Sequence, residues 1–175
     1  IAQNKDATFS PRFYTEDKFL IQTEYRQKNL QSSHTSDLSL FADNDTNTKN
    51  HFFYEFEKNI DINNFEKSDI KFQIQQTSSD TYLKANKLKS KLIKDSETLQ
   101  NSIGLNLYSN DFSIDTEVKI YEELDKNDSD RFEYIFPKID LVKKIDNKTD
   151  LNGDFSFSSE NLVRNFNTNV FEKTN

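Results

Sequence analysis

Few residues of this 175-residue chain have the types and the spacing that enzyme or metal chemistry requires. The two histidines, His34 and His51, have no cysteine or carboxylate at a spacing typical of a metal site. We therefore expect both histidines to be surface or strand-end residues. The acidic stretch 125–130 lacks the glycine and the distal glutamate of a calcium-binding loop, so we expect a plain acidic loop there.

The carboxylates of the strand expected at 112–122 also have no catalytic arrangement. Alternation predicts a ladder of charges on one strand face, formed by Asp115, Glu117 and Glu122 with Lys119, instead of an acid/base pair. The Asn-x-Ser/Thr triplets at 44, 127 and 147 are expected by chance in so asparagine-rich a chain. The sequence therefore predicts a protein that is not an enzyme and that has neither cofactor nor metal.

The composition favours a membrane barrel over a soluble core. A hydrophobic fraction of 33% and a mean hydropathy of -0.90 would by themselves indicate a weakly cored or disordered chain. The 16 Phe and 7 Tyr argue against disorder, and aromatics in an otherwise polar, alternating chain are typical of transmembrane β-barrels. No apolar run approaches the ~18 residues of a membrane helix, so any span must be made by strands. A net charge of -7 disfavours nucleic acid as a partner.

The elements that position these residues are predicted by period-two alternation, which is clearest in residues 1–28. A polar turn at 15–18 separates two short strands, each with one apolar and one polar face. We expect the apolar face to contact lipid and to carry Phe9, Pro11, Phe13, Phe19 and Ile21. We expect the polar face to line a lumen and to carry Thr8, Ser10, Arg12, Gln22, Glu24 and Arg26.

The same alternation continues along the chain and predicts an all-β protein. Phe72 and Phe112 are further candidates for the lipid-facing side, and Pro137 should lie at a bulge or an edge. The strands are near the ~10 residues of a tilted membrane crossing. Further strands are expected at 34–42, 51–58, 69–76, 99–108, 112–122, 131–144 and 151–159.

The predicted architecture is an up-and-down antiparallel meander of roughly nine strands in one curved sheet. Two unpaired edges are a liability that proteins avoid by closing the sheet, so we expect an open fragment of a large transmembrane β-barrel. The absence of methionine also favours a fragment or a processed product. We expect the strand with Pro11 to pair with 19–26 on one side and to be open on the other.

Residues 77–98 break the alternation. Here lysines alternate loosely with leucines, which leaves two interpretations. One is a solvated loop with a helical turn, and the other is a basic segment that lies near anionic lipid headgroups. The lysines are Lys84, Lys87, Lys89, Lys91 and Lys94, and the apolar residues are Leu83, Leu88, Leu92 and Ile93.

The amino-acid sequence of the opening hairpin resembles the start of the barrel domain in the LptD family, also called OstA or Imp. The matching residues are Asn4, Asp6, Ala7, Thr8, Phe9, Ser10 and Pro11, followed by Glu24, Tyr25 and Arg26. A weaker match is EYIFPKIDL at 133–141. The resemblance implies that residues 1–175 are the N-terminal part of an outer-membrane barrel domain, without the periplasmic domain and the remaining strands. It also implies the function, which is to insert lipopolysaccharide into the outer leaflet of the cell outer membrane.

The same resemblance implies roles and partners. Pro11 would loosen a lateral gate between the first and last barrel strands, because proline donates no hydrogen bond to a neighbouring strand. The implied partners are lipopolysaccharide, outer-membrane lipid, the plug lipoprotein LptE and the periplasmic lipopolysaccharide-transport bridge. Two alternatives stay open: another outer-membrane barrel such as a porin or transporter, and a soluble secreted β-sandwich adhesin that binds carbohydrate. In the β-sandwich, the aromatic faces would be buried against each other.

Overall fold

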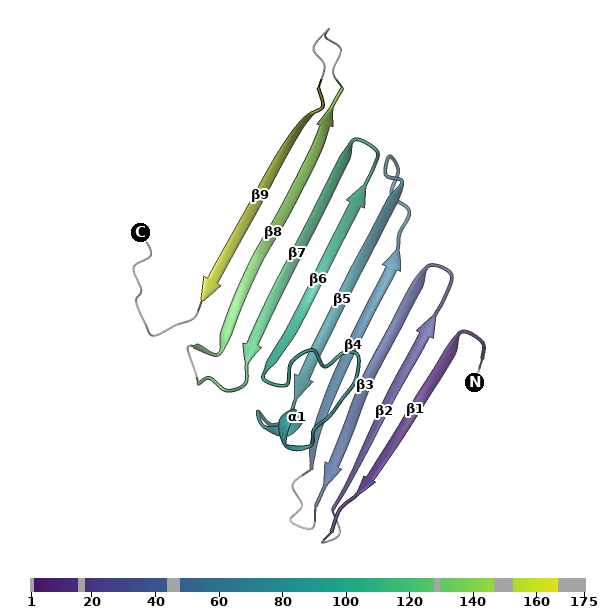
Figure 1. Cartoon of the computed structure of the whole chain (residues 1–175), viewed down its shortest axis with the longest axis vertical. Coiled ribbons are helices and arrows are strands. Elements are labelled where there is room, and N and C mark those ends of the chain that lie inside the picture. The colour runs from purple at the N-terminus through teal and green to yellow at the C-terminus, as the bar shows by residue number, and fades with distance from the viewer. Residues whose placement is uncertain (1, 16–17, 44–47, 128–129, 147–152, 167–175) are drawn as a thin grey trace.

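The structure is a computed structural model that describes residues 2–15, 18–43, 48–127, 130–146 and 153–166. Its strands follow one another along the chain and form a single sheet (Figure 1). One helical turn, α1, lies between the fifth and sixth strands. The elements are β1 (Lys5–Phe13), β2 (Phe19–Lys28), β3 (Ser32–Ala42), β4 (Lys49–Asn59), β5 (Lys67–Thr77), α1 (Tyr82–Ala85), β6 (Thr98–Tyr108), β7 (Phe112–Glu123), β8 (Phe132–Ile145) and β9 (Phe155–Phe166).

Each strand pairs antiparallel with its neighbours in sequence, in the order β1 to β9. The predicted all-β meander is therefore confirmed, and the alternative of two packed sheets is wrong for the described residues. The sheet is open, with β1 and β9 at its edges. Among the described residues, no helix is both long and apolar enough to cross a membrane.

The register separates an apolar face from a polar face across the whole sheet. Directly paired residues point to the same face, and residues alternate along each strand. Phe72 pairs with Ile103, which pairs with Val118, and Phe112 lies six residues before Val118 on the same face. By the same reasoning, one face carries Phe9, Pro11, Phe13, Phe19, Ile21, Phe72 and Phe112, and the other carries Thr8, Ser10, Arg12, Gln22, Glu24 and Arg26.

Pro137 lies at a bulge, as predicted. On the β7 side, Glu117 pairs with Lys138 and Lys119 with Ile135, so one β7 residue faces two β8 residues. The register with β9 shifts at the same place. A proline is tolerated there because the bulge leaves an unpaired position in the ladder.

Residues 78–97, which we call the inward loop, fold back over the polar face of the sheet (Figure 1). The helical turn was predicted, but the interpretation as a solvated loop is wrong for the leucines of the inward loop, which are buried. Leu83 is 1% exposed. The buried apolar cluster contains Leu20, Phe53, Tyr82, Leu83, Leu88, Leu92, Leu99 and Leu124.

Candidate functional site

The inward loop is held in place by apolar packing against the polar face. Leu20 of β2 and Phe53 of β4 lie on this face by their register, and each is at most 1% exposed because the loop covers them. Full burial of one leucine side chain is worth about 1.5–3 kcal/mol. The loop therefore has a defined position, although it contains only one helical turn.

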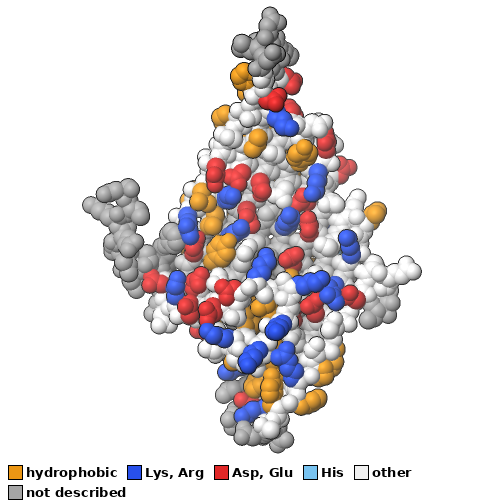
Figure 2. Space-filling model, viewed as in Figure 1, with side chains coloured by type: hydrophobic (Ala, Val, Ile, Leu, Met, Phe, Trp, Pro, Cys, Tyr) orange, Lys and Arg blue, Asp and Glu red, His pale blue; other side chains and the backbone are white. Residues whose placement is uncertain are grey.

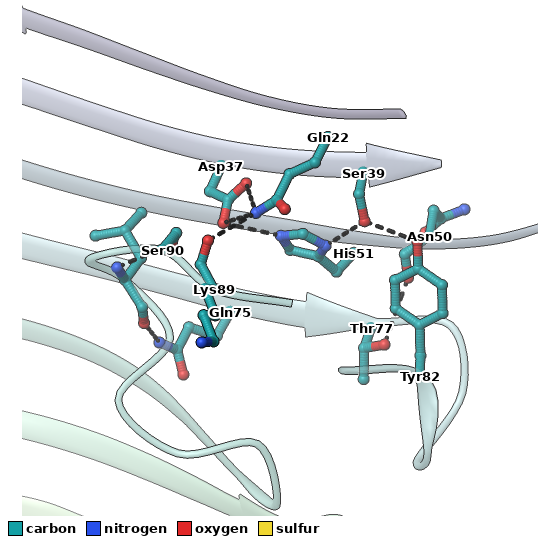
Figure 3. Close-up of polar contacts among 11 residues, drawn as sticks. Gln22, Asp37, Ser39, Asn50, His51, Gln75, Thr77, Tyr82, Lys89 and Ser90 are labelled. Carbon is teal, nitrogen blue, oxygen red and sulfur yellow. Dashed lines mark hydrogen bonds and ion pairs between the residues drawn. The ribbon is translucent and has the colours of Figure 1, made fainter. Parts of the chain in front are cut away.

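Beneath the loop lies a cluster of hydrogen-bonded polar side chains, the buried polar cluster, formed by Gln22, Asp37, Ser39, His51 and Tyr82 (Figure 3). The amide nitrogen of Gln22 donates to both carboxylate oxygens of Asp37, at 3.1 Å each. Nδ1 of His51 lies 2.6 Å from the hydroxyl of Ser39. That hydroxyl lies 2.7 Å from the phenol oxygen of Tyr82, which the loop contributes.

One arrangement of protons satisfies these contacts together. Nε2 of His51 lies 3.3 Å from Oδ2 of Asp37, within ion-pair distance but outside the geometry of a hydrogen bond. With a proton on Nε2, Nδ1 accepts from Ser39, and the Ser39 oxygen accepts from Tyr82. Burial raises the pKa of the Tyr82 phenol, which keeps this donor protonated.

Ser39, His51 and Asp37 are the residue types of a hydrolase triad, but their setting does not support catalysis. Their exposed fractions are 2%, 2% and 0%. The hydroxyl that would attack a substrate is already bonded to Tyr82. A nucleophile needs access to a reacting carbonyl, so we interpret the cluster as the polar half of the loop attachment. His51 lies near the start of β4, as the strand-end interpretation expects, but it is not a surface residue, because the loop covers it.

Three sheet side chains hold the backbone of the loop by its carbonyl groups. Arg12 donates to the carbonyl of Asn86 at 2.8 Å, and Gln22 donates to that of Lys89 at 3.3 Å. Gln75 donates to the carbonyl of Leu92 at 2.9 Å. The loop is thus attached at several points from β1 to β5. Gln22 does lie on the polar face, but it is covered by the loop instead of lining open space.

Arg131, which lies immediately before β8, attaches the start of the loop to the sheet. Its guanidinium donates to Asp80 at 2.7 and 3.1 Å and to Glu122 at 2.7 Å. The hydrogen bonds to Asp80 and Glu122 raise the pKa of Arg131, and the hydrogen bonds from Arg131 lower the pKa of Asp80. Glu122 therefore belongs to this ion-pair group. It does not belong to the predicted charge ladder, because its register places it on the opposite face from Glu117.

β1 forms an open edge of the sheet, and Pro11 is part of it. Pro11 pairs with Ile21 on one side. The amide of Tyr14 donates to Lys18 and that of Lys28 to Asn4, at 2.9 Å each, so the even-numbered residues of β1 direct their amides towards β2. The nitrogen of Pro11, an odd-numbered residue, therefore faces the open edge. The missing donor weakens only the side on which no strand is paired.

The apolar face remains largely uncovered. Its exposed side chains include Phe9 at 63% and Phe13 at 83%. A soluble monomer rarely leaves so many large apolar groups in contact with water. The other exposed apolar residues of this face include Leu38, Leu40, Phe52, Ile103, Ile145, Phe155 and Phe157.

The apolar residues of this face form a band that crosses the strands obliquely. One row of paired residues is apolar on β1 to β3 and polar on β4: Pro11, Ile21, Leu40 and Asn50. A second row is polar on β5 and apolar on β6 to β8: Ser68, Leu107, Ile114 and Leu141. The two rows are ten residues apart along the strand direction. Asn50 and Lys58 are eight residues apart on β4. Lys58 pairs with Ile70 of β5, and Ser68 lies two residues further in the same direction.

This offset gives the inclination of the band. Ten residues rise about 34 Å along a strand, and the seven steps from β1 to β8 span about 34 Å across the sheet. The band is therefore inclined by about 45° to the direction across the strands. The predicted lipid-facing residues lie on this face and the predicted lumen-facing residues on the other, and contact with lipid or with a lumen stays a prediction.

Among the described residues, no group of three or more His, Cys, Asp or Glu side chains could hold a metal ion. Comparison of the chain with protein-family models, with curated proteins and with solved structures gave no match.

Proposed function

We propose that the chain forms part of the wall of an outer-membrane β-barrel. The observation that carries this proposal is the oblique apolar band on one face of the sheet. In a membrane barrel the strands are tilted by about 35–45° from the membrane normal, so a band parallel to the membrane must cross them at that inclination. A soluble sheet has no reason to displace its apolar residues progressively along the strands from one edge to the other.

The polar face supports the same proposal. It carries ion pairs such as Lys119 with Glu117 at 2.8 Å and Lys138 with Asp140 at 2.8 Å, as the interior of a water-filled barrel does. The inward loop would lie inside this lumen and narrow it. Strands β1 and β9 would pair with further strands of a complete barrel.

Within this class, we propose the function of the LptD family, which is the delivery of lipopolysaccharide to the outer leaflet. The support is the sequence resemblance from Asn4 to Pro11 and the position of Pro11 on the open edge, where its nitrogen faces the unpaired side of β1. A weak contact at that edge is what a wall that opens sideways requires. A porin or transporter would share the oblique band, but it would have no use for a weakened edge.

Two measurements on the full-length protein test the two levels of the proposal. A folded barrel should migrate faster on a gel before heating than after heating, and a single migration position would argue against a barrel. Depletion of the protein from its own cells should reduce surface lipopolysaccharide while total lipopolysaccharide persists. Normal surface lipopolysaccharide with a heat-modifiable protein would favour a porin or transporter.

A further inference from the structure

The inward loop exposes lysines that have no acidic partner among the described residues. Lys87, Lys89, Lys91 and Lys94 are all exposed and take part in no ion pair in that part of the chain. The fifth lysine of the loop, Lys84, is paired with Glu97. Figure 2 shows basic side chains gathered on the lower half of this face of the molecule.

Other exposed lysines without an ion pair among the described residues, such as Lys28, Lys58, Lys126 and Lys144, are scattered along the chain, whereas four fall within residues 87–94 of the loop. On the polar face, Arg26 pairs with Asp6 at 2.7 Å, and Arg164 pairs with Glu133. Lys71 lies between Glu57 and Asp69 at 4.0 and 3.9 Å. The chain has 30 acidic residues against 23 basic ones, so acidic partners are plentiful. Four exposed lysines within eight residues, without an acidic partner in the described part of the chain, form a local positive surface that suits an anionic ligand.

The lysines also project from a fixed backbone. The carbonyls of Asn86, Lys89 and Leu92 are held by side chains of the sheet, at 2.8, 3.3 and 2.9 Å. Lys89 is itself one of the four lysines, and the other two anchored residues, Asn86 and Leu92, are direct neighbours of Lys87 and Lys91. A ligand that binds here therefore does not have to order the loop, and this lowers the entropic cost of binding.

We propose that Lys87, Lys89, Lys91 and Lys94 bind the phosphate groups of a phosphorylated glycolipid as it passes over the polar face. Lysine binds phosphate as a compact point charge with three donors. The proposal rests on the proposed function, which makes lipopolysaccharide the cargo, and it assigns the loop as the place where the phosphates of that cargo are held.

The test compares full-length proteins in detergent. One variant replaces Lys87, Lys89, Lys91 and Lys94 with Gln. The control makes the same charge change at the exposed residues Lys28, Lys58, Lys126 and Lys144, which lie outside the loop. Equilibrium binding is measured with lipopolysaccharide, with the same lipopolysaccharide after enzymatic removal of its phosphates, and with phosphatidylglycerol vesicles.

We expect the loop variant to bind lipopolysaccharide roughly tenfold more weakly than the wild type, and the control to bind it normally. Removal of the phosphates should weaken wild-type binding to the same extent and leave the loop variant unaffected. Equal binding by wild type and loop variant, or an equal loss in the control, would overturn the proposal and leave the proposed function intact. An equal loss on phosphatidylglycerol vesicles would assign the lysines to bilayer headgroups instead. No binding of lipopolysaccharide by the wild type would reject the proposed function itself.

Discussion

Pro11 lies at a position of β1 where the backbone nitrogen faces the open edge, so its missing amide donor affects only that side of the strand. Its pairing with Ile21 is in register, and its nitrogen faces away from β2. The β1–β2 hairpin therefore loses nothing from the proline. The cost falls on whichever strand pairs with the outer side of β1.

In the full-length protein, Pro11→Ala restores a donor at that outer side. We expect the contact there to strengthen by one hydrogen bond, about 0.5–1.5 kcal/mol, because an alanine amide can join the ladder. If this contact is the gate, cells should deliver lipopolysaccharide to the surface more slowly and become more permeable to a large hydrophobic antibiotic. Ser10→Ala is the matched control, since the amide of Ser10 already faces β2. Unchanged permeability in the Pro11→Ala strain would leave Pro11 as an ordinary edge-strand residue.

Asp37 is the carboxylate of the buried polar cluster and contacts both Gln22 and His51. In Asp37→Ala the buried amide of Gln22 loses its two hydrogen bonds to the carboxylate, and the buried imidazole of His51 loses its ion-pair partner, which should cost about 3 kcal/mol. The docked state of the loop should weaken by this amount, so trypsin should cleave after the loop lysines about 100-fold faster. Asp115→Ala, at an exposed position of the same face, should leave the cleavage rate unchanged. A loop that stays resistant in Asp37→Ala would show that its leucines suffice to hold it.

At the scale of elements, the inward loop shows what alternation along a strand does and does not predict. Alternation correctly places Asp37 and Ser39 on one face, and Phe53 on the same face as His51. The sequence does not reveal that Ser39 is paired with His51, because register between strands depends on the whole sheet. If the register had been known, it would have placed Ser39 beside His51. It would also have shown that Phe53, an apolar residue on the polar face, requires another segment to pack over it.

The ion pair between Arg131 and Asp80 makes the attachment of the loop dependent on pH. The pKa of Asp80 is lowered in the folded protein by its hydrogen bonds to Arg131. The stability from this pair is therefore fully present above the ordinary aspartate pKa and is lost as the pH falls through the lower folded value. We expect hydrogen exchange in the loop to accelerate below about pH 4 at matched intrinsic rates. Asp80→Asn should show faster exchange already at pH 7, without the additional acid-dependent step.

The acceleration of hydrogen exchange at low pH should be small, because the Asp80 side chain is 51% exposed and partly solvated. An acceleration that is equally steep in Asp80→Asn would assign the acid sensitivity to another carboxylate of the molecule.

At the scale of the whole molecule, the two faces of the sheet should differ in their access to water. Phe56 and Phe72 pair on the apolar face, and the neighbouring residues Glu55 and Gln73 pair on the polar face. Single cysteines at these four positions lie at similar heights in the sheet. In outer membranes, a water-soluble maleimide should label the cysteines at Glu55 and Gln73 and leave those at Phe56 and Phe72 unlabelled. Equal labelling of the cysteines at Phe72 and Gln73 would place both faces in water.

Most of the sheet could be predicted from the sequence because its strands alternate cleanly and follow one another with no crossover. The part that could not be predicted depends on contacts between segments distant in sequence. Leu83, Leu88 and Leu92 have too irregular a spacing to indicate which surface they cover, and lysines beside them suggest exposure. The attachment of the loop by Arg131 was equally hidden, since Asp80 lies 51 residues away in the chain.

The attachment of the inward loop has a consequence for the order in which the protein folds. Each hairpin forms from residues close in sequence, whereas the contacts of the loop with Arg12, Gln22 and Ser39 close separations of 74, 67 and 43 residues. Contacts of such separation form late, since they require the intervening chain to be ordered first. A one-residue slip of β3 would turn Asp37 and Ser39 to the other face and deprive Tyr82 of its partner. A chain with misaligned strands should therefore leave the loop undocked, with the backbone around its lysines accessible to proteases.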